Sequence, residues 1–105
     1  VDRINTRKLI YEQVQGTARL FLDARMNAEV VRALAVDGDA YSDRYLQTCF
    51  AQEEAFTGAC TAKSTIYAAN IAAGLLVTQF TRWLRRLPVD HDVQLNLLSM
   101  ELTVS

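Results

Sequence analysis

The residue best suited to covalent chemistry is Cys60, which directly precedes a long helical pattern over residues 61–87. A helix N-terminus favours the thiolate form of cysteine, and Lys63 close by would add to that effect. The alternative is a small buried hydrophobic residue, which is the commonest role of cysteine. Cys49, beside Phe50 in an apolar helical stretch, is predicted to be such a core residue.

Acidic side chains and one histidine are the other candidates for chemistry. Asp2 stands just before a helix predicted for residues 3–14, where it can cap the helix or hold a metal-bound nucleotide. Asp23 and Arg25 are two positions apart and therefore share one face of an extended chain. We expect a structural ion pair, with a ligand contact as the alternative. His91 has no second histidine beside it and is interpreted as a surface residue.

Several classes of function are disfavoured by composition and by missing motifs. The sequence has no glycine-rich phosphate loop and none of the GxSxG, HExxH or CxxC motifs. Two cysteines and one histidine are too few for the usual four-ligand zinc site. With 11 basic and 12 acidic residues the net charge is -1, so a nucleic-acid partner is not expected. The uncharged segment 64–81 is interpreted as a buried helix of a soluble protein, not a membrane span.

Three helices are expected from apolar periodicity, over residues 3–14, 40–50 and 61–87. Gly16 is placed to end the first and Pro88 to end the third. Because the third is apolar on most of its faces, we expect it to be buried in the core of something larger.

Strands are expected over residues 18–24, 29–36 and 92–104. The continuous apolar run of the first is typical of a strand covered on both faces, as in a parallel sheet. In the third, the apolar phase changes at Leu97-Leu98, which predicts a bulge, a bend or two packing partners. The pattern as a whole indicates an α/β fold.

The order of these pieces is similar to a known family. Its elements are Val1-Asp2 followed by Arg7, a strand ending in Ala24-Arg25-Met26, a second strand, the pair Cys49-Phe50, and Cys60 leading into a long helix. Together they resemble the second half of a ThiF/MoeB-type enzyme of the ubiquitin-activating superfamily, over roughly residues 1–87. Bacterial proteins of the ThiF family resemble the chain most closely.

The resemblance implies a fold and an activity. Residues 1–105 would be the C-terminal half of a Rossmann-like ThiF/MoeB fold, with a mixed sheet packed against a long buried helix. The parent enzyme would be an ATP-dependent adenylyltransferase that activates the C-terminus of a ubiquitin-like or sulfur-carrier protein. Asp2, separated from Arg7 by four residues as in the family, would contact magnesium and the phosphates of ATP. Cys60 would be the catalytic thiol, which attacks the adenylate to form a thioester or an acyl disulfide.

The sequence departs from the family pattern at the zinc site and at the ATP loop. Many relatives hold zinc with two CxxC pairs, whereas Leu46 stands where the partner of Cys49 should be, so no structural zinc is expected. The family's glycine-rich ATP loop lies in an N-terminal half that this sequence, which begins with Val1, does not contain. We therefore expect residues 1–105 alone to be inactive, and the parent to be a cytoplasmic homo-oligomer. The alternatives are a non-catalytic dimerisation or scaffold protein of the same fold, or a small module that binds partners through its C-terminal strand.

Overall fold

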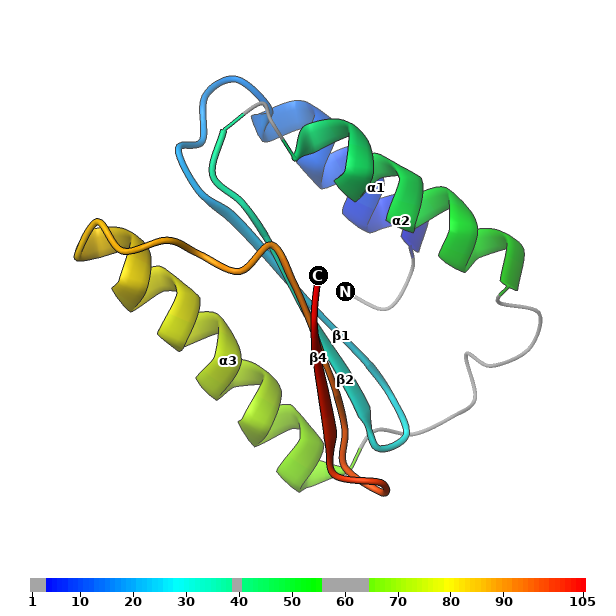
Figure 1. Cartoon of the computed structure of the whole chain (residues 1–105). Helices are drawn as coiled ribbons and strands as arrows, with labels where there is room; N and C mark the ends of the chain where they lie inside the picture. Colours follow the sequence, from blue (N-terminus) through cyan, green and yellow to red (C-terminus); the bar gives the residue numbers. More distant parts are fainter. Residues whose placement is uncertain (1–3, 39–40, 56–64) are drawn as a thin grey trace. The chain divides into compact units, whose positions relative to one another are not determined.

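A computed structural model describes residues 4–38, 41–55 and 65–105, and Figure 1 shows its elements. In chain order these are α1 (Ile4–Val14), β1 (Phe21–Asn27), β2 (Val30–Val36), α2 (Ser42–Ala55), α3 (Ile66–Leu84), β3 (Asp92–Asn96) and β4 (Glu101–Val104). The chain divides into two compact units. The helical unit comprises Val1–Phe21 and Val36–Thr61, and the sheet unit comprises Leu22–Ala35 and Ala62–Ser105.

The helical unit is built from α1 and α2, which contact each other. The predicted helix 3–14 is confirmed over its described residues, and Gly16 follows it with a φ of 88°. Glycine adopts this left-handed conformation without the steric penalty of a Cβ, and so it ends the helix as expected. Helix α2 is longer than predicted, because it continues to Ala55 instead of ending at residue 50.

Aromatic rings form the core of the helical unit. The rings of Tyr11 and Tyr45 lie 4.6 Å apart, and Phe21 meets both edge-on at 5.0 and 5.4 Å. Such edge-to-face geometry is favoured by the ring quadrupole. Cys49, one turn after Tyr45 on α2, is fully buried, which confirms its prediction as a core residue.

The sheet unit is organised around a four-stranded antiparallel sheet in the order β1-β2-β3-β4. Strand β2 confirms the prediction for residues 29–36, whereas β1 begins at Phe21 and not at residue 18. The parallel sheet predicted from the apolar run and the mixed sheet implied by the family resemblance are both wrong for the described strands, which are antiparallel. The apolar run has a different cause, since Phe21 at the start of β1 packs on the rings of Tyr11 and Tyr45. In β2, Val31 packs on Ala68 and Ala72 of α3.

The predicted strand 92–104 is a hairpin, and the change of apolar phase is its turn. β3 and β4 pair so that Leu95 faces Leu102 and Val93 faces Val104. Directly opposed residues share a face, so both apolar phases lie on the face of the sheet that carries Val31. The turn has no glycine or proline; Asn96 accepts hydrogen bonds at Oδ1 from the backbone of Leu98 and Ser99 at 3.0 and 3.2 Å.

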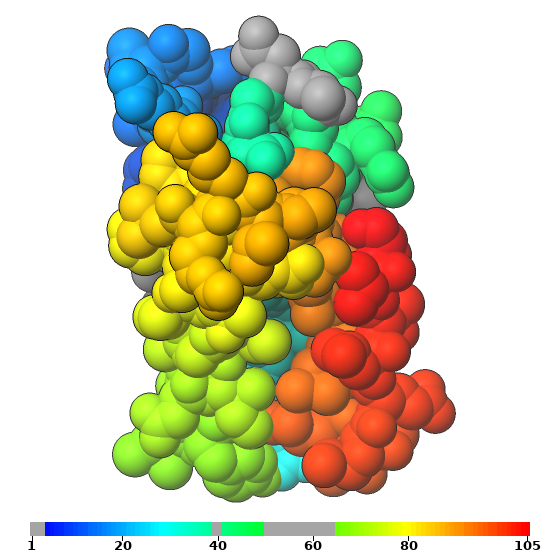
Figure 2. Space-filling view, turned by 60° about the vertical axis from the view of Figure 1, so that its left-hand side comes forward, coloured from blue at the N-terminus to red at the C-terminus, as the bar shows by residue number. Residues whose placement is uncertain are grey.

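Helix α3 has two different faces, and Figure 2 shows it beside β3 and β4. Ala68, Ala72 and Gln79 are buried. On the opposite side large apolar side chains are exposed, among them Ile66 at 80% and Val77 at 61%. The described residues therefore do not confirm a long buried helix, because only one side of α3 is covered, where Leu75 packs beside Ala68 and Ala72.

Helix α3 ends in a defined cap. Arg86 has a φ of 60°, Leu87 donates its N–H to Arg82 over 2.9 Å, and Arg86 donates to Trp83 over 3.1 Å. These two bonds form a Schellman motif. In this motif the residue that follows the helix is left-handed, so that the next N–H groups can bond to the last free carbonyls of the helix. The helix predicted for residues 61–87 therefore spans Ile66–Leu84, and this cap ends it before Pro88 is reached.

Candidate functional site

The residues predicted to carry catalysis, Asp2 and Cys60, lie outside the described residues. Arg7, the family partner of Asp2, lies in the second turn of α1 and is half-buried. The structure therefore gives a position for one of the three residues on which the enzymatic interpretation depends.

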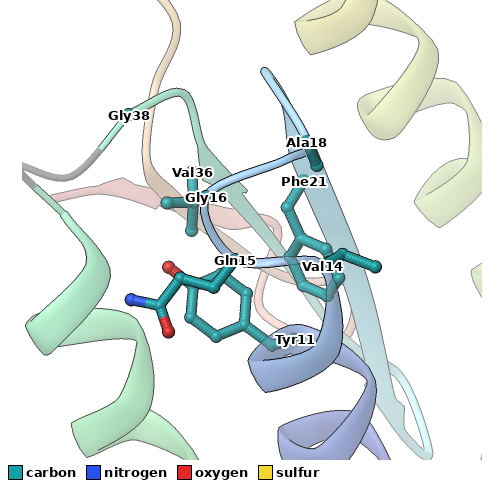
Figure 3. A pocket seen from close by; sticks show the side chains of 8 residues that line it. All are labelled: Tyr11, Val14, Gln15, Gly16, Ala18, Phe21, Val36 and Gly38. Atoms are coloured by element: carbon teal, nitrogen blue, oxygen red, sulfur yellow. The ribbon is translucent and has the colours of Figure 1, made fainter.

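A cavity of about 180 Å³ in the helical unit is a candidate binding site (Figure 3). It is lined by residues of α1, of the segment that follows it and of the neighbouring ends of β1 and β2: Tyr11, Val14, Gln15, Gly16, Ala18, Phe21, Val36 and Gly38. Figure 3 shows the ring of Tyr11 and the carboxamide of Gln15 side by side at its wall. Gly16 and Gly38 both have positive φ angles, so each rim of the cavity is formed by a backbone bend.

A polar network joins the cavity wall to α2. Ser42 is 4% exposed, and its Oγ accepts hydrogen bonds from the Tyr11 hydroxyl at 2.6 Å and from Gln15 Nε2 at 2.9 Å. Because both donors are already satisfied by one buried oxygen, the network holds Tyr11 and Gln15 in fixed positions. The carbonyl oxygen of the Gln15 amide is a further hydrogen-bond acceptor of this network.

The lining residues limit the chemistry of the cavity. The described residues around it include no charged, histidine or cysteine side chain, and the Tyr11 hydroxyl donates to Ser42. The arrangement can hold a small neutral group through apolar contact and the Gln15 amide. Sequence analysis did not find this site, and the only local signal was the pair of turn glycines.

The predicted ion pair between Asp23 and Arg25 is confirmed. Arg25 Nε donates to Asp23 Oδ2 at 3.0 Å, and both side chains are 4% exposed. A second pair lies between neighbouring strands, where Arg32 of β2 holds both carboxylate oxygens of Asp92 at 2.9 and 2.7 Å. Because each guanidinium is bound to a carboxylate, a structural role for Asp23 and Arg25 is favoured over contact with a ligand.

His91 is tied to the sheet by two hydrogen bonds. Its Nδ1 lies 2.8 Å from the carbonyl oxygen of Ala35, and its own carbonyl accepts from the N–H of Ala35 at 2.9 Å. The residue, which was predicted to lie at the surface, is half-buried. The preceding residue, Asp90, accepts from Arg82 at 2.5 Å and donates its N–H to the buried Gln79 at 2.8 Å. Asp90 and His91 therefore fix the position of the segment that joins α3 to β3.

Comparison of the chain with protein-family models, curated proteins and solved structures found no match. Among residues 4–38, 41–55 and 65–105, no group of three or more His, Cys, Asp or Glu side chains is placed to hold a metal ion. No helix in the described part of the chain is long and apolar enough to cross a membrane.

Proposed function

We propose that the chain is part of an ATP-dependent adenylyltransferase of the ThiF/MoeB type, which activates the C-terminus of a ubiquitin-like or sulfur-carrier protein. The observation that carries the proposal is the sequence order: Asp2 before a helix with Arg7, then a strand pair, and then Cys60 before a long helix. The described residues support it in part. Helix α1 begins at Ile4, two residues after the acidic position. A long helix also follows the cysteine, but α3 begins at Ile66 with Thr65 as its N-cap, so Cys60 does not directly precede it as expected.

In the proposed chemistry the substrate carboxylate attacks the α-phosphate of ATP, so that an acyl-adenylate forms and pyrophosphate leaves. The Cys60 sulfur then attacks the acyl carbon, its bond to the AMP oxygen breaks, AMP departs and the thiol proton passes to solvent. Asp2, with the glycine-rich loop and basic groups of an N-terminal half, would hold magnesium and the phosphates.

The role of Asp2 is tested by pyrophosphate–ATP exchange in a protein that contains this chain together with its N-terminal half. Asp2→Ala should abolish exchange, whereas Asp43→Ala, a change at an exposed aspartate in the first turn of α2, should not. Unchanged exchange in the Asp2 variant would show that this residue has only a capping role.

The role of Cys60 is tested by covalent capture of the substrate protein. Cys60→Ser should leave pyrophosphate exchange intact and should abolish a thioester adduct that is sensitive to hydroxylamine. The matched control is Cys49→Ala at the fully buried cysteine, which should retain the adduct in whatever fraction remains folded. An adduct that survives in the Cys60 variant would assign Cys60 to structure.

A second candidate is a non-catalytic dimerisation or scaffold protein of the same fold. The exposed apolar face of α3 is compatible with it, because such a face marks an interaction site, although a missing N-terminal half would cover it equally well. Calorimetric titration of the 105-residue chain with ATP and magnesium tests whether the chain alone holds a nucleotide site. Tight binding by this chain alone would contradict the expectation that its nucleotide site is incomplete.

A further inference from the structure

The last stretch of the chain has an apolar, exposed side chain at every second position. Leu102 and Val104 in β4 are 60% and 52% exposed, and Leu98 and Met100 in the preceding turn are exposed further still. Figure 2 shows this stretch in red at the surface beside β3. Alternation of this kind is typical of a strand with one apolar face. All four residues of β4 are exposed, so that face is not covered by the described residues.

The pairing register shows which backbone groups of β4 point away from the sheet. Ser105 donates its N–H to the carbonyl of Asp92, the position opposite it, at 2.9 Å. Hydrogen-bonded and non-hydrogen-bonded pairs alternate along an antiparallel ladder, so the next position bonded to β3 is Thr103. The N–H and C=O groups of Leu102 and Val104 therefore point outward, to the open edge of the sheet.

Strand β4 lacks the usual protection of a sheet edge. The order β1-β2-β3-β4 places no described strand on its outer side. Natural sheets protect such edges with lysine, proline, bulges or inward-pointing charges. The opposite edge strand, β1, carries the buried charges Asp23 and Arg25. In contrast, residues 97–105 contain no lysine, arginine or proline, and the register of β4 with β3 is continuous. This edge can accept one more strand.

We propose that the open edge of β4 binds an extended segment of another protein, which adds to the sheet as an antiparallel strand. The N–H and C=O groups of Leu102 and Val104 would hold the segment, as when a peptide extends a sheet. The described pairings of this sheet are antiparallel, and that pairing is the more stable per residue. Sequence analysis offered the C-terminal strand as a binding element, and the register adds the bonding groups, the direction and the pattern of the partner.

The side chains of β4 specify the chemistry of that segment. Residues opposite Leu102 and Val104 would share their apolar face, so β-branched apolar residues fit there. A polar residue fits between them, opposite Thr103. Glu101 is opposite Asn96 on β3, so a lysine or arginine on the added strand would supply a countercharge from the outer side. A second copy of β4 offers no cation, which favours a different protein as the occupant.

NMR titration of the 105-residue chain with a short peptide tests the proposal. The peptide, blocked at both ends, reads threonine, valine, threonine, valine, arginine from its N-terminus. In the antiparallel register its valines pair with Val104 and Leu102, and its arginine lies opposite Glu101. The amides of β4 should show saturable shifts, and the amide protons of Leu102 and Val104 should exchange more slowly when the peptide is bound.

Methylation of the peptide nitrogens provides a matched pair of ligands. Methyl groups on both valine nitrogens remove the N–H groups that point to β4, and they should weaken binding at least about 10-fold. A methyl group on the central threonine nitrogen, whose N–H points away from β4, should have little effect. Equal effects of the two modifications would overturn the proposed pairing.

Variants of the chain test the site from the other side. Leu102→Pro removes an outward N–H but no bond to β3, so the fold should persist while peptide binding is lost. Glu101→Lys should weaken binding of the arginine peptide and strengthen binding of a peptide that ends in glutamate, a reversal that does not depend on the proline variant. The control is Val77→Asp at an apolar side chain of α3 that is as exposed as Leu102, and it should leave binding unchanged.

The absence of saturable shifts in β4 would overturn the proposal, as would binding that neither Leu102→Pro nor Glu101→Lys alters. If the amides of Leu102 and Val104 become protected as the concentration of the chain alone is raised, the occupant is a second copy and a different protein is excluded. The inference does not rest on the proposed adenylyltransferase. Peptide binding is measured without ATP, so either proposal can fail alone.

Discussion

Asp23 and Arg25 form an ion pair within a single strand, 3.0 Å apart and almost completely removed from solvent. Two charges this deeply buried lose their hydration, and their mutual attraction must compensate for that loss. The pair contrasts with Arg32 and Asp92, whose side chains are 28% and 13% exposed.

The buried pair should be sensitive to the loss of one partner. Arg25→Met removes the guanidinium that is paired with Asp23 in a buried position, and we expect the free energy of unfolding to fall by about 3–5 kcal/mol. Arg32→Met at the more exposed pair should cost about 1 kcal/mol or less. Urea unfolding followed by Trp83 fluorescence, which reports on the sheet unit, measures both. Equal losses in the two variants would contradict the importance given to burial.

Ser42 should matter more than either of its donors. Tyr11→Phe removes one hydroxyl and should cost about 1 kcal/mol, the usual net value of one hydrogen bond. Ser42→Ala removes the oxygen that accepts from both Tyr11 and Gln15. A buried tyrosine hydroxyl then loses its acceptor, so we expect the free energy of unfolding to fall by about 1–3 kcal/mol. Near-UV circular dichroism during urea unfolding detects the clustered tyrosines. The order of the two effects is the result to check, and a larger loss from Tyr11→Phe would contradict it.

The cap of α3 can be improved. Arg86 occupies a left-handed position at a φ of 60°, where a Cβ is unfavourable. Arg86→Gly should therefore stabilise the chain by roughly 0.5–1 kcal/mol, even though glycine makes the unfolded chain more flexible. Arg85, at a φ of -85°, is the matched control. Thermal melts should show Arg85→Gly lowering the midpoint while Arg86→Gly raises it.

The β3–β4 turn depends on Asn96. Its side chain accepts from two backbone N–H groups, those of Leu98 and Ser99. We expect Asn96→Ala to cost about 1 kcal/mol and to speed amide exchange in β4. Gln94→Ala, two residues earlier on the same strand and exposed, should have little effect. Hydrogen exchange measured by NMR gives the local effect directly, and unaltered exchange in β4 would assign the turn to other contacts.

Local patterns predicted the elements and contacts that arise from neighbours in sequence. Helix α1 and strand β2 followed from periodicity, and the Asp23–Arg25 pair followed from the alternation of side chains along a strand. The hairpin at Leu97–Met100 was missed because it contains neither glycine nor proline; Met100 adopts the left-handed conformation at a φ of 58° instead.

The cavity and its network could not be predicted from local patterns. Tyr11 and Ser42 are 31 residues apart, and neither lies in a motif that implies the other. The exposure of α3 was missed for a related reason. Its apolar residues occur on most of its faces, and only the packing of Ala68 and Ala72 against Val31 determines which face is covered.

The last hydrogen bond of the sheet has a mechanical consequence. Ser105 donates its N–H to the carbonyl of Asp92 at 2.9 Å, where β3 begins. Tension applied at Ser105 away from the sheet would load the β3–β4 bonds one after another, so that β4 peels from its open end towards the Leu97–Met100 turn. The cluster of Val31, Ala68 and Ala72 joins β2 to α3 and does not depend on the β3–β4 bonds. Anything tethered to Ser105 can therefore pull one strand free while the helix and its packing partners hold.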